Sequence, residues 1–169
     1  MNGTRDVIEF SIGKEVYAVD LADVREVIGH DSRTVYSGAR LVGAFARAVK
    51  TYPVGLHHIS QYRGEDMVIL DPSGVLNIPE GGPGERKRVV IVLRESATRI
   101  LTGLIVDEIR TVTTISGDMV EDPSSILDNR NQLVKGIIRG SSSKGSGDPE
   151  FVIWLDLRVL IGLMEKGGA

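Results

Sequence analysis

Apolar and polar residues alternate near the start of the chain. Ile8, Phe10 and Ile12 recur at every second position, and a second apolar run occupies residues 16–21 after a Gly-Lys pair. A period of two places such side chains on one face of a strand, and glycine between two runs is typical of a tight turn. The pattern predicts a β-hairpin.

Similar runs continue along the chain. Residues 23–28 are rich in β-branched side chains, residues 67–71 are almost wholly apolar, and residues 89–93 and 100–106 form another pair. Short apolar runs bounded by turn residues predict strands, and the last pair predicts a second hairpin. After the last strand the apolar spacing changes to three and four, which predicts a terminal helix at about 156–166.

The two halves of the chain carry the same pattern. A fixed shift of 85 positions superposes two separate blocks: Val24, Arg25 and Val27 on Ile109, Arg110 and Val112, and Val68, Leu70 and Asp71 on Ile153, Leu155 and Asp156. One shift that serves two blocks indicates an internal duplication, against the alternative of chance similarity between strands rich in Val and Ile.

The duplication and the 20 glycines, beside only 1 Trp, 4 Tyr and 3 Phe, favour small β-barrels. We expect an all-β fold of two tandem five-stranded barrel subdomains with a few short helices, forming one domain over 1–169. The first subdomain is expected at about 6–78 and the second at about 88–156. A Gly- and Pro-rich connector at about 79–87 would join them.

Two segments interrupt the symmetry of the halves. Residues 29–52 are basic and carry Leu41, Phe45 and Ala48 at helical spacing, which predicts a short amphipathic helix. We expect it to pack on a barrel, with a role as an extra docking element as the alternative. Residues 140–148 are rich in Gly and Ser but lack the spacing of a phosphate-binding loop, so they predict a hairpin loop.

Composition narrows the classes of function. The chain has 20 Lys and Arg against 23 Asp and Glu, a formal net charge of −3, which does not favour a nucleic-acid partner. No Cys is present, so disulfides and thiolate metal sites are excluded. No signal peptide or bilayer-spanning run is evident. We expect a cytoplasmic protein without metal or cofactor and without direct membrane insertion.

Catalytic groups do not converge in the sequence. His57 and His58 are adjacent, so on a strand their rings would point to opposite faces, and the consecutive acids Asp107 and Glu108 would diverge in the same way. A nucleophile with a base and an orienting group is not apparent. An enzyme is the class of function that we favour least.

Two charged residues lie among apolar neighbours. Glu26 stands between Val24 and Ile28, and Arg63 precedes the apolar run 67–71. One interpretation is that these charges protect exposed strand edges from aggregation. The other is a Glu26–Arg63 ion pair on the outside of the first subdomain, beside a surface used by a partner. Such a pair would contribute more to specificity than to stability.

Five motifs, in order over about residues 6–163, resemble those of the CheW family, the adaptors that link chemoreceptors to the histidine kinase CheA. They are Val24-Arg25-Glu26-Val27, Arg63-Gly64 with Asp71, Gly103-Leu104-Ile105-Val106-Asp107, Leu133-Val134-Lys135-Gly136-Ile137 and Leu155-Asp156. The resemblance implies two SH3-like barrels side by side and a scaffold that is not an enzyme and needs no cofactor.

The resemblance also implies partners and a site. The partners would be the cytoplasmic tip of a methyl-accepting chemoreceptor, held between the barrels, and the CheW-like regulatory domain of a CheA-type histidine kinase. Carried over by motif position, Glu26, Arg63 and Gly64 would belong to the receptor-binding surface. The apolar wall of the groove would be formed by Val24, Ile28 and Val106.

The chain departs from the family pattern near Arg63. Val68 replaces the family's Pro, Pro72 replaces its Leu, and His58 replaces its Gly, while segment 29–52 is longer than is typical. A second hypothesis is therefore a CheW-like adaptor of another kinase pathway with a different partner surface. A third, a small-barrel nucleic-acid binder, is disfavoured by the few aromatic residues and the negative net charge.

Overall fold

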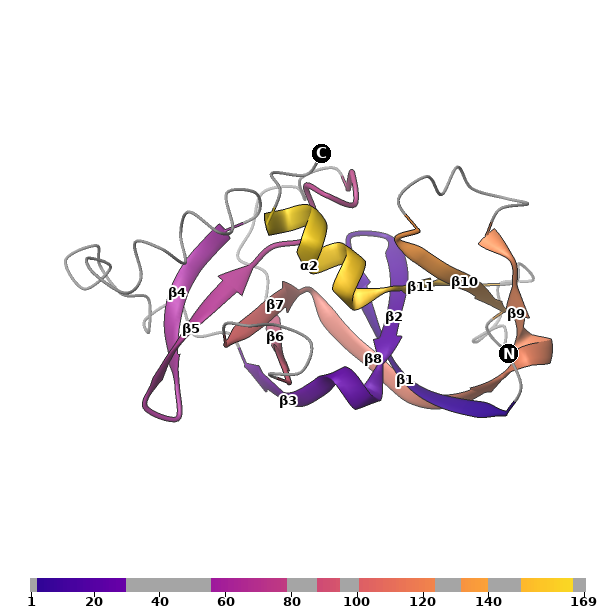
Figure 1. The fold of residues 1–169 in the computed structure, drawn as a ribbon, viewed down its shortest axis with the longest axis horizontal. Coiled ribbons are helices and arrows are strands. Elements are labelled where there is room, and N and C mark those ends of the chain that lie inside the picture. The colour runs from indigo at the N-terminus through magenta and orange to yellow at the C-terminus, as the bar shows by residue number, and fades with distance from the viewer. Residues whose placement is uncertain are drawn as a thin grey trace.

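The computed structural model describes residues 3–29, 56–78, 88–94, 101–123, 132–139 and 150–165. These segments form strands and one α-helix, with two 3-10 turns at Leu21–Asp23 and Gly117–Met119 (Figure 1). The elements are β1 (Thr4–Ile12), β2 (Glu15–Asp20), β3 (Val24–Gly29), β4 (Leu56–Tyr62), β5 (Glu65–Leu70), β6 (Val89–Leu93), β7 (Thr102–Val106), β8 (Glu108–Ser116), β9 (Val120–Glu121), β10 (Val134–Arg139), β11 (Phe151–Leu155) and α2 (Leu157–Glu165).

Most of the predicted elements are present. The two predicted hairpins are β1–β2 and β6–β7, and the terminal helix is α2. The all-β class is therefore confirmed. The connector at 79–87, the loop at 140–148 and the basic segment 29–52, apart from Gly29 at the end of β3, lie outside the described residues.

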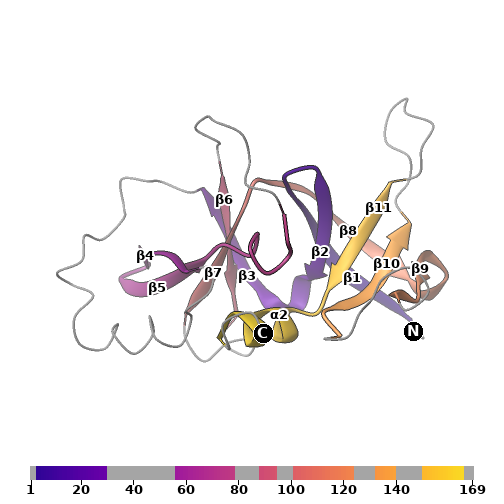
Figure 2. The same ribbon diagram turned by 90° about the horizontal axis from the view of Figure 1, so that it is seen from above.

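Two sheets lie side by side, with α2 between them on one flank (Figures 1 and 2). One sheet has six strands in the order β8-β1-β2-β11-β10-β9, and the other has five in the order β3-β6-β7-β5-β4. Neighbouring strands are antiparallel except for β2 with β11 and β5 with β7, which are parallel.

Each sheet takes strands from both halves of the chain. The first hairpin, β1–β2, joins β8 to β11, and the second hairpin, β6–β7, joins β3 to β5. When the halves are interchanged, β8-β1-β2-β11-β10 becomes β3-β6-β7-β5-β4, so the strand orders reproduce each other. The sheets thus support the duplication, but they do not follow a division of the chain at the connector, because the hairpins are exchanged.

The strand register preserves the 85-residue shift. Val68 pairs with Thr102 in the five-stranded sheet, and the residues 85 positions away in each direction, Ile153 and Tyr17, pair in the six-stranded sheet. The shift found in the sequence is therefore kept in the backbone pairing of the two sheets. Two corresponding residues in the two sheets are called counterparts below.

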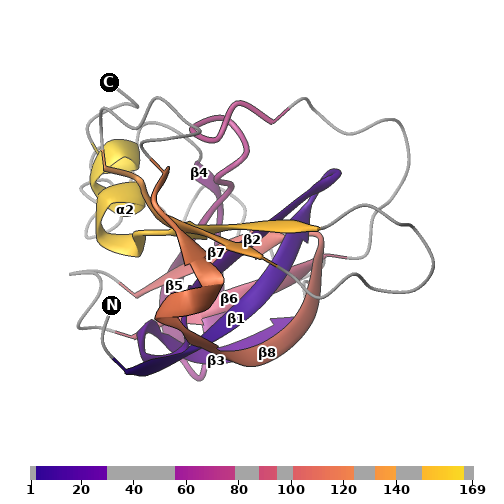
Figure 3. The ribbon, with the colours of Figure 1, turned by 90° about the vertical axis from the view of Figure 1, so that its right-hand side faces the viewer.

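The largest apolar cluster lies between the two sheets and under α2. The helix contributes four fully buried side chains, Leu157, Leu160, Ile161 and Met164. Their spacing of three and four places them on one helical face, and burying each contributes roughly 1.5–3 kcal/mol relative to exposure. In Figure 3 the helix lies along one flank of the strands.

A smaller apolar cluster lies on the opposite face of each sheet. In the six-stranded sheet it includes Val7 and Trp154, and in the five-stranded sheet it includes their counterparts, Val92 and Ile69. The duplicated pattern therefore specifies both faces of each sheet.

Two departures from the family pattern have a local explanation. The backbone N–H of Val68, which replaces proline, donates to the carbonyl of Leu101 at 2.9 Å and ties β5 to β7, a hydrogen bond that proline cannot donate. Pro72 begins a turn in which Leu76 N–H donates to its carbonyl at 3.0 Å. Proline suits this first position because no hydrogen bond from its nitrogen is needed there.

Candidate partner-binding surface

A polar cluster joins the two edges of the five-stranded sheet. Glu26 lies on β3 at one edge, and Tyr62 and Arg63 lie at the end of β4, at the other. Arg63 Nη2 donates to Glu26 Oε2 at 3.1 Å, and the Tyr62 hydroxyl donates to the same oxygen. The ion pair predicted between Glu26 and Arg63 is therefore present.

The turn between β4 and β5 positions Arg63. Tyr62 pairs with Glu65, which leaves a loop of two residues, Arg63 with φ +49° and Gly64 with φ +81°. Two consecutive residues of positive φ are typical of the type I′ turn, whose twist matches that of the flanking strands. Gly64 adopts this backbone without steric cost, whereas Arg63 carries some strain in order to face Glu26.

Two arginines stack on Tyr62. The guanidinium carbons of Arg25 and Arg63 each lie 5.3 Å from the centre of its ring, within the range of cation–π attraction. The hydrogen bond to the Glu26 carboxylate raises the pKa of Tyr62 because it favours the protonated phenol. The cluster therefore presents two cations around one carboxylate.

The cluster is accessible to a partner. The Arg63 side chain is 66% exposed and the Glu26 side chain 36% exposed. An ion pair of this exposure contributes about 0–1 kcal/mol to stability, because solvent screens it. Its charges are therefore available for recognition at little cost to the fold.

The predicted apolar residues divide between surface and core. Val24 and Val106, expected to line an exposed groove, are buried at 7% and 2% exposure in the cluster between the sheets. The expectation of exposure was wrong for Val24 because a bulge between Val24 and Glu26 turns it to the opposite face of β3 from Glu26 and Ile28. Ile28 is half-buried, and Val27 beside it is exposed.

Glu26, Arg63 and Gly64 could be predicted from the sequence, whereas Tyr62 and Arg25 were not. The available signal was their adjacency: each immediately precedes a residue that had been selected. A buried tyrosine commonly donates its hydroxyl to a nearby acceptor, here Glu26.

Neither a metal site nor a membrane-spanning helix is found among the described residues. Across the described segments, no group of three or more His, Asp or Glu side chains is arranged to hold a metal ion. No helix in that same part of the chain is long and apolar enough to cross a membrane.

The chain is similar to known chemotaxis proteins. The family model of the CheW-like domain matches residues 6–164. A probable chemotaxis protein CheW of Rhizobium etli is 23% identical over 137 residues, which cover 80% of this chain and 78% of that protein. The chemotaxis protein CheW of Rhizobium meliloti is 26% identical over 138 residues, covering 81% and 79%.

A solved structure shares the fold. The scaffolding protein TtCheW of Thermoanaerobacter tengcongensis superposes with a TM-score of 0.64 at 20% sequence identity, over 95% of this chain and 89% of that one. The overall fold is thus shared with a solved protein structure.

Proposed function

This chain belongs to the CheW family, and on that basis we propose that it is a chemotaxis scaffold that couples methyl-accepting chemoreceptors to a CheA-type histidine kinase. It works by binding both proteins in the cytoplasm at receptor arrays, and it catalyses no reaction. Its partners are the cytoplasmic tip of the receptor and the CheW-like regulatory domain of the kinase.

The observation that supports this role is the exposed Glu26–Arg63 cluster, whose residues lie in sequence motifs that resemble those of the family. Glu26, Arg63 and Gly64 form the receptor contact, with Ile28 at its apolar border. Val24 and Val106 support the contact indirectly, since both are buried and anchor β3 and β7 in the core. Charged residues at the border of such a contact set which partner docks and how fast.

Reconstitution with the receptor and kinase of the same organism tests the proposal. The protein, a receptor cytoplasmic fragment and the kinase should elute together as a ternary complex. Arg63→Glu should weaken receptor binding by about tenfold or more, because it places two carboxylates together, while kinase binding is kept.

Arg139→Glu is the matched control. Arg139 is also 66% exposed and also pairs with a carboxylate, that of Glu121, but it lies in the other sheet. Equal receptor binding by wild type and a folded Arg63→Glu protein would remove Arg63 from the site. Recovery of a kinase complex that excludes chemoreceptors would favour the adaptor of another kinase pathway.

A further inference from the structure

A second polar cluster lies at the end of β2 in the six-stranded sheet. Asp20 accepts three hydrogen bonds: Oδ1 from Trp154 Nε1 at 2.8 Å, and Oδ2 from Arg5 Nη1 at 2.9 Å and from Lys135 Nζ at 3.1 Å. Its side chain is 13% exposed. Burial alone would raise the pKa of Asp20, but the three hydrogen bonds outweigh burial and lower it, so the carboxylate stays charged.

The fold itself does not require this cluster. In the five-stranded sheet the counterparts of Arg5, Asp20 and Trp154 are Val90, Ile105 and Ile69, which belong to the small apolar cluster of that sheet. Equivalent backbone positions are thus filled by aliphatic side chains in one unit and by two charges and an indole in the other. Burying polar groups costs free energy. Polar groups at positions where apolar side chains also fold are therefore a reason to look for a ligand.

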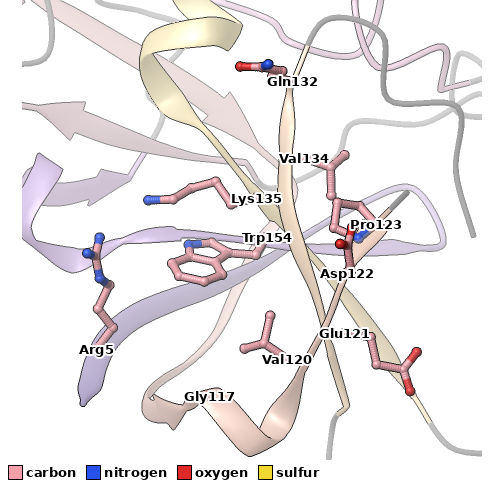
Figure 4. A pocket seen from close by; sticks show the side chains of 10 residues that line it. All are labelled: Arg5, Gly117, Val120, Glu121, Asp122, Pro123, Gln132, Val134, Lys135 and Trp154. Carbon is pink, nitrogen blue, oxygen red and sulfur yellow. The ribbon is translucent and has the colours of Figure 1, made fainter. Parts of the chain in front are cut away.

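The cluster borders a pocket of about 580 Å³ (Figure 4). Arg5 and Lys135 lie on one side of the Trp154 ring, and Asp122 and Glu121 lie on the other. Glu121 is held by hydrogen bonds from Arg139. A cavity of this size accommodates a few side chains or a small molecule.

The cationic side of the pocket has one surplus positive charge. Arg5 and Lys135 share the single carboxylate of Asp20, and both side chains donate to its Oδ2. Because the two cations lie together, a second carboxylate can contact both of them. Each cation also lies against the indole, Lys135 Nζ at 4.6 Å and the Arg5 guanidinium carbon at 5.9 Å from the ring centre. The unused N–H groups of both side chains remain available as donors.

We propose that this pocket binds the carboxylate of an acidic side chain within an otherwise apolar segment of a protein partner. One surplus positive charge suits a monoanion such as a carboxylate, whereas a phosphate chain or nucleic acid carries more negative charge than it can balance. Val120 and Val134 line the pocket and provide apolar contact for the flanking residues. The site is separate from the Glu26–Arg63 cluster, which lies in the other sheet.

Trp154 is the only tryptophan of the chain, so it reports on the pocket directly. The probes are the peptides acetyl-Leu-Glu-Leu-amide, acetyl-Leu-Gln-Leu-amide and acetyl-Leu-Leu-Leu with a free carboxyl terminus. Titration is followed by indole fluorescence and by the single indole N–H signal in a ¹⁵N-correlated NMR spectrum. We expect saturable binding of the Glu peptide that weakens with added salt, and at least tenfold weaker binding of the Gln peptide.

The third peptide distinguishes the source of the carboxylate. Binding of the free carboxyl terminus in preference to the Glu side chain would overturn the assignment to a side chain. Equal binding of the Glu and Gln peptides, or no shift of the indole signal with any peptide, would overturn the proposal as a whole.

Variants connect the signal to the cations. Lys135→Gln should weaken binding of the Glu peptide about tenfold. The matched control Lys14→Gln should not, because Lys14 lies on the β1–β2 turn, at the end of that hairpin away from Arg5 and Asp20. Circular dichroism confirms that each variant is folded. If Lys135→Gln is unfolded, Arg5→Gln replaces it, since the Arg5 side chain is 50% exposed. Unchanged affinity in a folded variant of either cation would contradict the proposal.

Discussion

Each sheet carries an ion pair between its outer strand and the end of a hairpin, and the two pairs have opposite polarity. In the five-stranded sheet the strand β3 provides the acid, Glu26, and the hairpin provides the base, Arg63. In the six-stranded sheet the strand β8 provides the base, Arg110, and the segment just before β11 provides the acid, Glu150. Both units therefore have such an ion pair, but the acid and the base are exchanged between the outer strand and the hairpin.

The two ion pairs also differ in what surrounds them. The counterpart of Glu26 is Thr111, and the counterpart of Arg110 is Arg25, which stacks on Tyr62. Exposed positions have thus diverged between the units while the parallel register has been kept. Divergence also reaches largely buried positions, because Asp20 and Trp154 stand where the other unit has Ile105 and Ile69. The strand pairing of a duplicated sheet is therefore constrained more strongly than the side chains that it carries.

The largest expected effect comes from exchanging the side chains of two counterparts, Ile105 and Asp20. Ile105→Asp places a carboxylate at a position 2% exposed among apolar side chains, and we expect a loss of about 4 kcal/mol or more in the free energy of unfolding. The reciprocal Asp20→Ile should cost only about 1–3 kcal/mol, because Arg5 and Lys135 can turn toward water. Urea denaturation measures both, and equal costs would contradict the asymmetry of the two interiors.

A smaller effect is expected where a strand passes close to its neighbours. A Cβ added at Gly103 would lie 2.5 Å from Val90 Cγ1 and 3.1 Å from Ile69 Cδ1, so Gly103→Ala should cost about 1–3 kcal/mol. The counterpart of Gly103 is Ala18, where the place of Val90 is taken by the half-exposed Arg5. Ala18→Gly should therefore cost only about 1 kcal/mol. A neutral Gly103→Ala in thermal or urea unfolding would show that Val90 moves aside.

The smallest expected effect comes from the exposed ion pairs. Glu26→Gln and Glu150→Gln should each change the free energy of unfolding by about 0–1 kcal/mol. Only Glu26→Gln should lower the pKa of Tyr62, because it removes the carboxylate that accepts the hydrogen bond from the Tyr62 hydroxyl. Alkaline titration of phenolate absorbance, with Tyr62→Phe as the reference, measures that change.

The sign of the pH dependence follows from the raised pKa. Since the folded state holds the Tyr62 proton more tightly, its contribution to stability is fully present below the usual pKa of about 10 and is lost as the pH rises through the raised value. The difference in stability between wild type and Glu26→Gln should shrink over that range. A difference that stays constant with pH would place the Tyr62 hydroxyl away from Glu26.

Much of the fold could be predicted from local pattern. The hairpins follow from apolar alternation around short turns, and the 85-residue shift correctly related β3 to β8 and β5 to β11. The exchange of hairpins could not be predicted, because alternation fixes which face of a strand is buried but not which distant strand lies beside it. Val24 was placed on the wrong face since a bulge is invisible to a period of two.

The two polar clusters differ in how much of each could be predicted from the sequence. Glu26 and Arg63 were found because each is a charge flanked by apolar residues inside a recognisable motif. Asp20 was not, because its partners Lys135 and Trp154 are 115 and 134 positions away and only the parallel pairing of β2 with β11 brings them together.

The exchanged hairpins set the order in which the molecule can be completed during synthesis. The β1–β2 hairpin leaves the ribosome first, yet both of its neighbours in the sheet, β8 and β11, are made in the second half of the chain. Until residue 155 has emerged, the apolar faces of that hairpin have no permanent cover, and contacts so distant in sequence form slowly. The exchange of hairpins therefore lengthens the time during synthesis in which this apolar surface is open to aggregation.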